Sequence, residues 1–211
     1  MPARKTRERI LETSLALFNE RGEPNVSTNH IAEELEISPG NLYYHFRSKE
    51  DIVEQLFAAH EMRLDEALTM PGERLPDLED LWFQLHSVFE CLWASRFLYR
   101  DLVDILSRHR RIRVRFGRLL RRARESVQRL LSGLALRGMV AASPREMEAA
   151  TENVLLVTVF WLGYDAARRG QTEGASADLA AGVYQVMMLI APLLAQPARN
   201  HLLALAAAYR R

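Results

Sequence analysis

The sequence predicts an all-helical protein, and two observations support this fold class. Glycine and proline gather at a few points along the 211 residues, among them 22–24, 39–40, 70–76 and 170–174, and long segments separate these points. The long segments repeat apolar residues at helical spacing and show no strand-like alternation. With 48% hydrophobic and 26% charged residues, the chain has enough material for one large domain, or for a small domain and a larger one.

The composition also bears on compartment and partners. Cys91 is the only cysteine, so the chain can form no internal disulfide, and a reducing cytoplasm is the expected location. The basic N-terminal segment lacks the apolar stretch of a secretory signal. Charge-free apolar stretches such as 154–164 are shorter than the roughly 20 residues that cross a bilayer, so we expect no membrane partner. The net charge of +1 neither favours nor excludes a polyanionic partner.

The first helix is expected from about Thr6 to Glu20. Gly22 follows its end, in the position where glycine commonly stops a helix. One face of this helix carries its expected core residues, which are Ile10, Ser14, Leu17 and Phe18.

Two short helices follow, and each begins with a serine that can cap it. Ser27 is the expected N-cap of a helix over 28–35, and Ser38 is the expected N-cap of the next one. Leu42 and Phe46 are four residues apart, so they share the inner face of this third helix. Two short capped helices separated by a tight turn predict a helix-turn-helix.

A longer linking helix is expected over 49–69, because Ser48 and Asp51 match the capping box that opens many helices. The sequence therefore predicts a three-helix helix-turn-helix domain over 1–50, which continues into the linking helix, and a larger helical domain over 51–211. Further helices are expected over 77–95, 97–108, 111–137, 145–169, 177–195 and 199–209.

The third helix has an outer face suited to nucleic acid. Because Leu42 and Phe46 point inward, the tyrosines and histidine between them must point largely outward. Such a helix can enter the major groove of DNA, where Asn41 can bond base edges and the aromatic side chains can donate to phosphates. Gly40 permits close approach, and the first helical turn at Lys49 favours a phosphate oxygen. A tyrosine-rich protein interface is the alternative for this face.

The segment VSTNHIAEELEISPGNLYYHFRSKEDI, from Val26 to Ile52, resembles the DNA-binding domain of the TetR family of bacterial one-component regulators. The resemblance extends over residues 6–60, while the C-terminal part matches only in length and helical character. It implies residues that approach the DNA backbone, residues that address bases and residues that hold phosphates. In that order these are Ser27, Thr28 and Asn29; Pro39, Gly40 and Asn41; and Tyr43, Tyr44, His45 and Lys49.

One position departs from the family pattern. Where such proteins often carry glycine in the turn, this sequence has Glu36. A positive φ at this residue would cost on the order of 1 kcal/mol, and the carboxylate would place a negative charge near DNA.

The resemblance further implies that the larger domain senses a ligand and forms a homodimer through its last two long helices. The helices expected over 145–169 and 177–195 each carry an apolar stripe, and two copies of both stripes can form a four-helix interface between two monomers. Alternatively, both stripes build only the core of the monomer. The expected interface residues are Val154, Leu155, Thr158, Leu162, Val183, Met187, Ile190 and Leu194.

Aromatic residues concentrate in the larger domain and predict a pocket for a small hydrophobic or aromatic effector, if a cavity remains among them. A packed core is the alternative. The pocket candidates are Trp82, Phe83, His86, Phe89, Trp93, Phe97, Phe116, Trp161 and Tyr164.

Nine arginines lie between Arg108 and Arg124. They can hold an anionic ligand or a second stretch of DNA, or they can form a solvated face that pairs with acids of the linking helix. The acids considered for this pairing are Glu61, Asp65 and Glu66.

Together these features predict a ligand-responsive regulator, by default a repressor, which binds a pseudo-palindromic double-stranded operator as a homodimer. No cofactor or metal is expected, because His86 and Glu90 alone do not make a metal site. An enzyme is not expected, since the chain contains no Glu-x-x-His pair, phosphate loop or G-x-S-x-G. The alternatives are a helical enzyme and a protein-interaction module without specific DNA binding.

Overall fold

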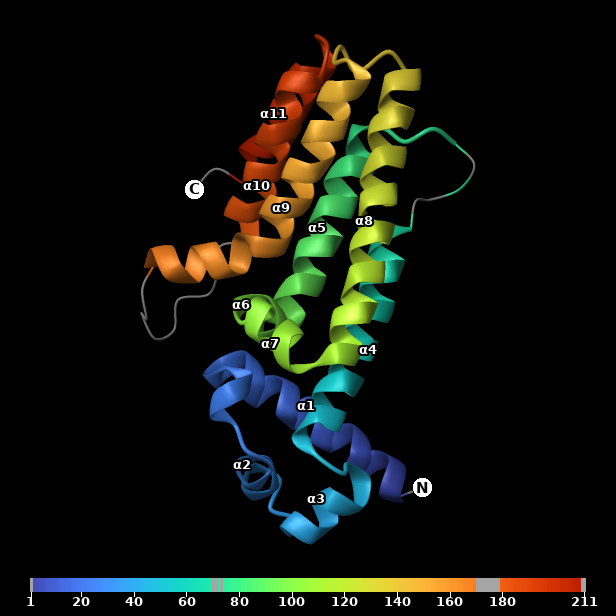
Figure 1. Cartoon of the computed structure of the whole chain (residues 1–211). Coiled ribbons are helices and arrows are strands. Elements are labelled where there is room, and N and C mark those ends of the chain that lie inside the picture. The colour runs from blue at the N-terminus through green and yellow to red at the C-terminus, as the bar shows by residue number, and fades with distance from the viewer. Residues whose placement is uncertain (1, 70–71, 73, 170–178, 210–211) are drawn as a thin grey trace. The chain divides into compact units, whose positions relative to one another are not determined.

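The computed structural model describes residues 2–69, 72, 74–169 and 179–209. In these ranges the regular secondary structure is helical, apart from an isolated bridge between Val140 and Leu194, and this confirms the all-helical prediction (Figure 1). None of the described helices is both long enough and apolar enough to cross a membrane.

The chain forms two compact units. The first combines the residues up to 62 with residues 95–116, and the second combines residues 63–94 with those from 117 onward. The sequence-based boundary at residue 50 does not anticipate that residues 95–116 join the N-terminal helices. Phe97 makes this connection: its ring centroid lies 5.4 Å from that of Phe18, and its backbone N–H donates to Asn19 Oδ1 at 3.1 Å.

The first unit begins with the helix that the sequence predicts. Helix α1 (Pro2–Arg21) is followed by Gly22, whose φ of 81° ends the helix, and by the short 3-10 helix η1 (Glu23–Asn25). The four core residues expected in α1 are all buried, namely Ile10, Ser14, Leu17 and Phe18.

Helices α2 (Thr28–Glu34) and α3 (Pro39–His45) form the helix-turn-helix with the predicted caps. The Oγ atom of Ser27 accepts a hydrogen bond from the backbone three residues on, and Ser38 caps α3 in the same way; both bonds are 3.2 Å long. In the turn between the helices, Glu36 has a φ of 54°. The positive φ considered for this residue is therefore present, at a cost on the order of 1 kcal/mol.

Helix α4 (Lys49–Leu68) begins at the predicted capping sequence. Ser48 Oγ accepts from the backbone N–H of Asp51 at 3.3 Å, while the Asp51 carboxylate accepts from the backbone N–H of Arg47 at 3.1 Å. The carboxylate thus bonds one residue earlier than a standard capping box requires. These two hydrogen bonds together hold the first turn of α4 in place.

The single helix expected over 97–108 is divided in two, so this prediction is wrong. Helix α6 (Arg96–Arg100) ends before Asp101, which leaves the helical conformation with φ −113° and ψ 30°, and α7 (Leu102–Arg108) follows. Three consecutive residues of α6 are buried, more than one face of a continuous amphipathic helix supplies, and these are Phe97, Leu98 and Tyr99.

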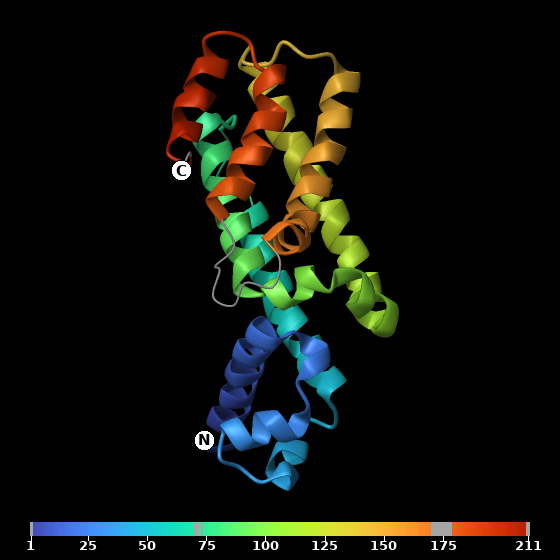
Figure 2. The same cartoon turned by 90° about the vertical axis from the view of Figure 1, so that its left-hand side faces the viewer.

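The second unit is built around α10 (Leu179–Ile190), which packs against both α5 (Leu78–Ala94) and α9 (Pro144–Arg169), while α11 (Ala198–Ala207) packs against α5 and α10 (Figures 1 and 2). The helix expected over 177–195 starts outside the described residues.

At its C-terminal end the predicted helix is too long. Helix α10 stops at Ile190, and the chain continues as the 3-10 helix η2 (Ala191–Leu193). Pro192 lies within η2, where it has no N–H to continue the helical bonding of α10.

Gly182 is a point of close approach between α10 and two of its neighbours. A Cβ atom at this position would lie 2.4 Å from Phe89 of α5 and 2.7 Å from Trp161 of α9. Both rings are buried against the glycine, so the absence of a side chain is what lets the three helices meet.

The residues predicted at the dimer interface are buried or half-buried within the second unit of a single chain. Because α10 lies against both α5 and α9, these faces of α9 and α10 are already covered within one chain. Leu155 and Thr158 are half-buried. The remaining six are buried, namely Val154, Leu162, Val183, Met187, Ile190 and Leu194.

The nine pocket candidates are divided between the two units. Phe97 and Phe116 belong to the first unit and the other seven to the second. Phe83 is 66% exposed and Tyr164 is 59% exposed. Aromatic spacing along the sequence does not report which unit a residue joins. Phe89 and Trp161 are buried, and the half-buried candidates are Trp82, His86 and Trp93.

The half-buried candidates include a small cluster. Trp82 stacks on His86 with a centroid distance of 5.9 Å, His86 Nε2 lies 3.2 Å from Glu90 Oε1, and Tyr209 hydrogen-bonds the other ring nitrogen at 3.3 Å. His86 and Glu90 therefore interact directly with each other, one helical turn apart on α5.

The arginine run lies mostly on α8 (Arg110–Leu136) and pairs with acids, as one of the alternatives predicted. Arg115 bonds Glu61 at 2.5 Å, and Arg122 bonds Asp65 at 2.7 Å; both acids are on α4, and each pair lies within one unit. The arginines of the run with an acidic partner are Arg108, Arg111, Arg115, Arg122 and Arg124.

Replacing Glu36 by glycine is expected to raise the free energy of unfolding by about 1 kcal/mol, because glycine adopts the positive φ without a clash of its Cβ. Chemical denaturation measures the change. The matched control is Glu33→Gly, in the exposed part of α2, where glycine should lower the same free energy by about 1 kcal/mol. A destabilised Glu36→Gly protein would contradict the assigned strain.

Gly182→Ala is expected to lower the free energy of unfolding by about 1–3 kcal/mol, because the new methyl group overlaps the rings of Phe89 and Trp161. The control is Gly117→Ala on α8, where a Cβ meets nothing within 4 Å and should stabilise the helix by about 1 kcal/mol. Equal effects of the two substitutions in thermal denaturation would refute the close packing at Gly182.

Candidate DNA-binding surface

The outer face of α3 is exposed, as its two inner residues require. Leu42 and Phe46 are buried, whereas Tyr43 is 49% and Tyr44 81% exposed. Pro39, Gly40 and Asn41 in the first turn of the helix are exposed as well, and His45 is half-buried. The first turn of α3 and its two tyrosines are therefore available to a partner.

A hydrogen bond between side chains joins α3 to α2. The hydroxyl groups of Thr28 and Tyr43 lie 3.0 Å apart. The bond fixes the ring of Tyr43 at the junction of the two helices, while Tyr44 lies with its ring edge-on to His45, at a centroid distance of 5.1 Å. Residues predicted to contact DNA from both helices thus belong to one continuous surface.

The surface is hollowed between the start of α2 and the start of α4. We refer to this hollow of about 440 Å³ as the polar concavity. Backbone N–H groups at the start of a long helix such as α4 favour anions. The concavity is lined by Pro24, Asn25, Val26, Ser27, Thr28, His30, Tyr43, Arg47, Ser48, Lys49 and Glu50.

The structure places four of the ten predicted DNA-binding residues in the polar concavity and the rest outside its lining. Asn29 is exposed on α2, and the other five lie on α3. His30 and Arg47 line the concavity although they are absent from the predicted set. His30 has a recognisable local signal, because it stands three residues after Ser27 and its Nδ1 accepts the Ser27 backbone N–H at 3.3 Å. The four predicted residues in the lining are Ser27, Thr28, Tyr43 and Lys49.

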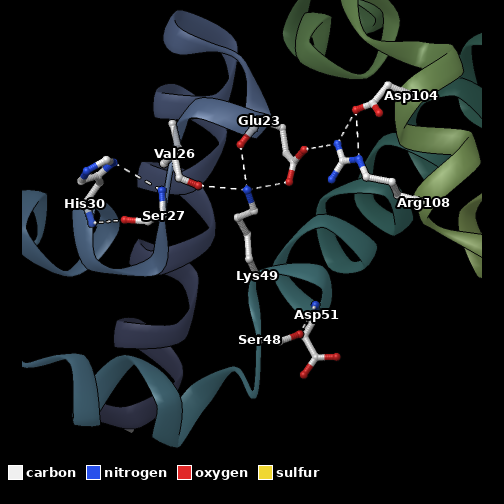
Figure 3. A network of polar contacts seen from close by, with 9 residues as sticks. All are labelled: Glu23, Val26, Ser27, His30, Ser48, Lys49, Asp51, Asp104 and Arg108. Carbon is white, nitrogen blue, oxygen red and sulfur yellow. Dashed lines mark hydrogen bonds and ion pairs between the residues drawn. The ribbon is translucent and has the colours of Figure 1, made fainter.

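The ammonium group of Lys49 points into the protein, which differs from the contact expected for it. It donates to the backbone carbonyls of Glu23 at 3.0 Å and Val26 at 3.1 Å, and it lies 2.9 Å from the carboxylate of Glu23 (Figure 3). The last contact is an ion pair rather than a well-aligned hydrogen bond. A phosphate contact by the same ammonium would require these interactions to loosen.

Glu23 is a fully buried carboxylate between two cations. On the side opposite Lys49, Arg108 of α7 donates to its Oε2 at 2.6 Å and to Asp104 Oδ2 at 2.6 Å (Figure 3). The sequence carries no local signal for this contact, because Glu23 and Arg108 lie 85 residues apart. We call these four residues, Glu23, Lys49, Arg108 and Asp104, the Glu23 network.

Burial is the largest influence on the pKa of Glu23 and raises it, but the side chains of Arg108 and Lys49 together outweigh burial and leave the pKa below its ordinary value of 4.5. Hydrogen bonds to Asp104 and Glu23 raise the pKa of Arg108, which stays charged. Since the folded pKa of Glu23 is lowered, its ionisation stabilises the fold above the ordinary value and the contribution is lost as pH falls through the folded pKa.

A second surface lies on the second unit. Leu156, Phe160 and Tyr164 recur at every fourth position of α9 and are 58%, 46% and 59% exposed. They border a groove of about 490 Å³ between α9 and α10, which we call the α9–α10 groove. Contiguous exposed apolar side chains of this kind mark interaction surfaces. The groove is lined by Leu156, Val157, Phe160, Trp161, Tyr164, Arg168, Ala181, Gln185 and Leu189.

Within the described part of the chain, no three His, Cys, Asp or Glu residues are arranged to hold a metal ion. Cys91 is half-buried, and its thiol lies 3.7 Å from the carbonyl oxygen of Arg63. Burial raises the pKa of the Cys91 thiol, which keeps it protonated and less reactive.

Comparison with known proteins places both parts of the chain in one family. Residues 10–56 match the model described as bacterial regulatory proteins, tetR family, and residues 60–202 match the model described as bacterial transcriptional repressor. A helix-turn-helix transcriptional regulator of Staphylococcus aureus strain USA300 is 48% identical over 50 residues, which are 24% of this chain. That match spans about a quarter of the length of the curated relative, 27%.

Solved structures extend the likeness to almost the whole chain. A TetR-family transcriptional regulator from Marinobacter aquaeolei VT8 is 39% identical, with a TM-score of 0.87 over 98% of this chain and 99% of that one. The SmeT–triclosan complex shares the fold at 20% identity, with a TM-score of 0.59 over 92% of this chain and 94% of that one. The family models and the Marinobacter regulator together show that the chain belongs to the TetR family of bacterial DNA-binding transcriptional regulators.

Proposed function

We propose that the protein is a ligand-responsive repressor that binds a pseudo-palindromic operator as a homodimer in the cytoplasm and is released by a small hydrophobic or aromatic effector. The observation that carries the DNA-binding part is the exposed face of α3, with its first turn and two tyrosines outward and its apolar residues buried. A dimer presents two such helices, which enter successive major grooves about one helical turn apart.

The residues of the surface divide between base and phosphate contacts. Pro39, Gly40 and Asn41 at the start of α3 address base edges, where the Asn41 amide bonds adenine most readily. The side chains that follow in α3, and the start of α2, contact the DNA backbone. The first turn of α4 offers its backbone N–H groups to a phosphate. The ammonium of Lys49 instead donates to the carbonyls of Glu23 and Val26 inside the protein and so holds α4 next to the segment before α2. The backbone-contacting residues are Ser27, Thr28, Asn29, Tyr43, Tyr44 and His45.

The dimer forms through the α9–α10 groove, in place of the buried stripes that the sequence suggested. Leu156, Phe160 and Tyr164 expose an apolar face that a second copy of the same face can cover about a twofold axis. Arg168 is the charged residue of this lining. Two α9 helices and two α10 helices then build the four-helix interface.

Effector binding is supported by the fold and by the aromatic content of the second unit. The SmeT structure, which shares the fold, is a complex with triclosan. An effector that prefers a conformation different from the one that binds DNA weakens operator binding, and DNA weakens effector binding by the same factor. No cofactor is needed in this scheme, and repression follows when the bound dimer blocks polymerase.

The assignment of base and phosphate contacts is tested with duplexes that the wild-type protein enriches from a random-sequence pool. Asn41→Ala should change the preferred base at one position of each half-site, with a loss of about 1–3 kcal/mol for the original sequence. Tyr44→Phe should weaken binding to all enriched sequences by a similar factor, about fivefold, because it removes one phosphate hydrogen bond. Equal losses across sequences for both variants would reject this assignment.

The dimer interface is tested by Phe160→Glu, which places a charge in the α9–α10 groove. The dimer dissociation constant in analytical ultracentrifugation should rise by at least a hundredfold, because an unpaired charge at the centre of an apolar interface is costly. Leu136→Gln, at an apolar residue of α8 that is 75% exposed, is the matched control and should leave the constant unchanged. A Phe160→Glu protein that remains dimeric would exclude this face.

A further inference from the structure

We propose that Glu23 is a positioning residue for DNA binding, whose buried carboxylate holds the two walls of the polar concavity together and fastens them to α7. The inference rests on the proposed function, because it concerns how the same surface is kept in a shape that fits DNA. Glu23 is buried, does not line the concavity and does not contact DNA itself. It acts through Lys49 and Arg108.

The carboxylate of Glu23 has no contact with solvent, and its charge must therefore be balanced inside the protein. Its side chain is 0% exposed and lies between Lys49 at 2.9 Å and Arg108 at 2.6 Å. A buried charge that loses a partner is strongly destabilising, since neither water nor another ion replaces the lost interaction. The position of Glu23 is for this reason tied to the positions of both cations.

Lys49 ties the first wall of the concavity to the second. The lining residues Pro24 to Thr28 and His30 form one wall, and Tyr43 with Arg47 to Glu50 forms the other. From the start of α4, the Lys49 ammonium reaches across to the backbone carbonyls of Glu23 and Val26, directly before the cap of α2 (Figure 3). The separation between the start of α2 and the start of α4 is set by these interactions.

Arg108 carries the same constraint to α7. It is the last residue of this helix, and Asp104, one turn earlier, holds its guanidinium from the other side at 2.6 Å. The network balances two carboxylates with two cations. If α7 moves without η1, Arg108 leaves the buried carboxylate with a single cation; α7 and the walls of the concavity are therefore expected to move together.

The surroundings make the loss of Arg108 more costly. Burial raises the pKa of Asp101, and the nearby charges of Asp104 and Glu23 raise it further. Three acids thus lie close to one another at the junction of η1, α6 and α7. Arg108 is the cation that two of them, Glu23 and Asp104, share.

The competing role for these cations is direct contact with phosphate. The two roles differ in how binding depends on salt, because each phosphate contact contributes about 0.9 to the slope of log K against log salt concentration. A positioning residue changes the affinity and leaves this slope as it was. The slope is therefore the measurement that separates the two roles.

The experiment uses full-length protein and the duplex enriched by the wild type. Glu23→Gln, Arg108→Met and the double variant are compared with wild type for operator dissociation constant and salt slope, after circular dichroism and denaturation show that each is folded. Arg111→Met is the matched control, since it breaks a 3.2 Å ion pair with Glu54 in the same unit. Arg108 is 39% exposed, so Arg108→Met keeps the test valid if Glu23→Gln does not fold.

Each single variant is expected to raise the operator dissociation constant at least tenfold with an unchanged salt slope. The dissociation constant of the double variant should stay within threefold of that of the single variant that binds more weakly, because both substitutions break the same Glu23–Arg108 ion pair. Arg111→Met should stay within threefold of wild type. Wild-type affinity in Arg108→Met, multiplied effects in the double variant, or a slope reduced by about one would each overturn the inference. Failure of the wild type to enrich any sequence would instead overturn the proposed function.

Discussion

The structure of the DNA-binding surface depends on how few apolar residues hold α3 in place. The helix has only seven residues, too few to be stable by itself, and within it Leu42 alone is buried; Phe46 follows directly after its end. These two side chains fix one face of the helix against the unit, and the serine cap fixes its start. The remaining side chains have no part in the core, and this leaves a polar, aromatic face for recognition.

The N-terminal elements could be predicted from the sequence because their signals are local. A cap and the backbone nitrogen that it accepts from lie three residues apart, and Leu42 and Phe46 lie four apart, so a short stretch of sequence contains each complete interaction. The direction of the Lys49 side chain has no such signal. Its partners are 23 and 26 residues away, and only the folded chain shows that a cation expected to hold a phosphate bonds carbonyl groups inside the protein.

The second unit shows a different limit of sequence-based prediction. Helix α9 is apolar on more than one side: Val154 and Leu162 face the core, while Leu156 and Phe160 face outward. Apolar spacing identifies both sets and cannot tell which of them the monomer buries. The ion pairs of the α8 arginines were easier to predict, because α4 carries several acids that can pair with them. Arg115 pairs with Glu61 and Arg122 with Asp65.

Glu36 also matters through its charge, apart from the strain of its positive φ. With α3 in the major groove as proposed, an exposed carboxylate in the preceding turn repels every duplex alike, whatever its sequence. The bacterial chromosome offers millions of competing sites, and occupancy of the right one depends on the ratio of affinities rather than on their absolute size. A uniform electrostatic penalty shortens the time spent on random chromosomal DNA and leaves the discrimination by α3 intact.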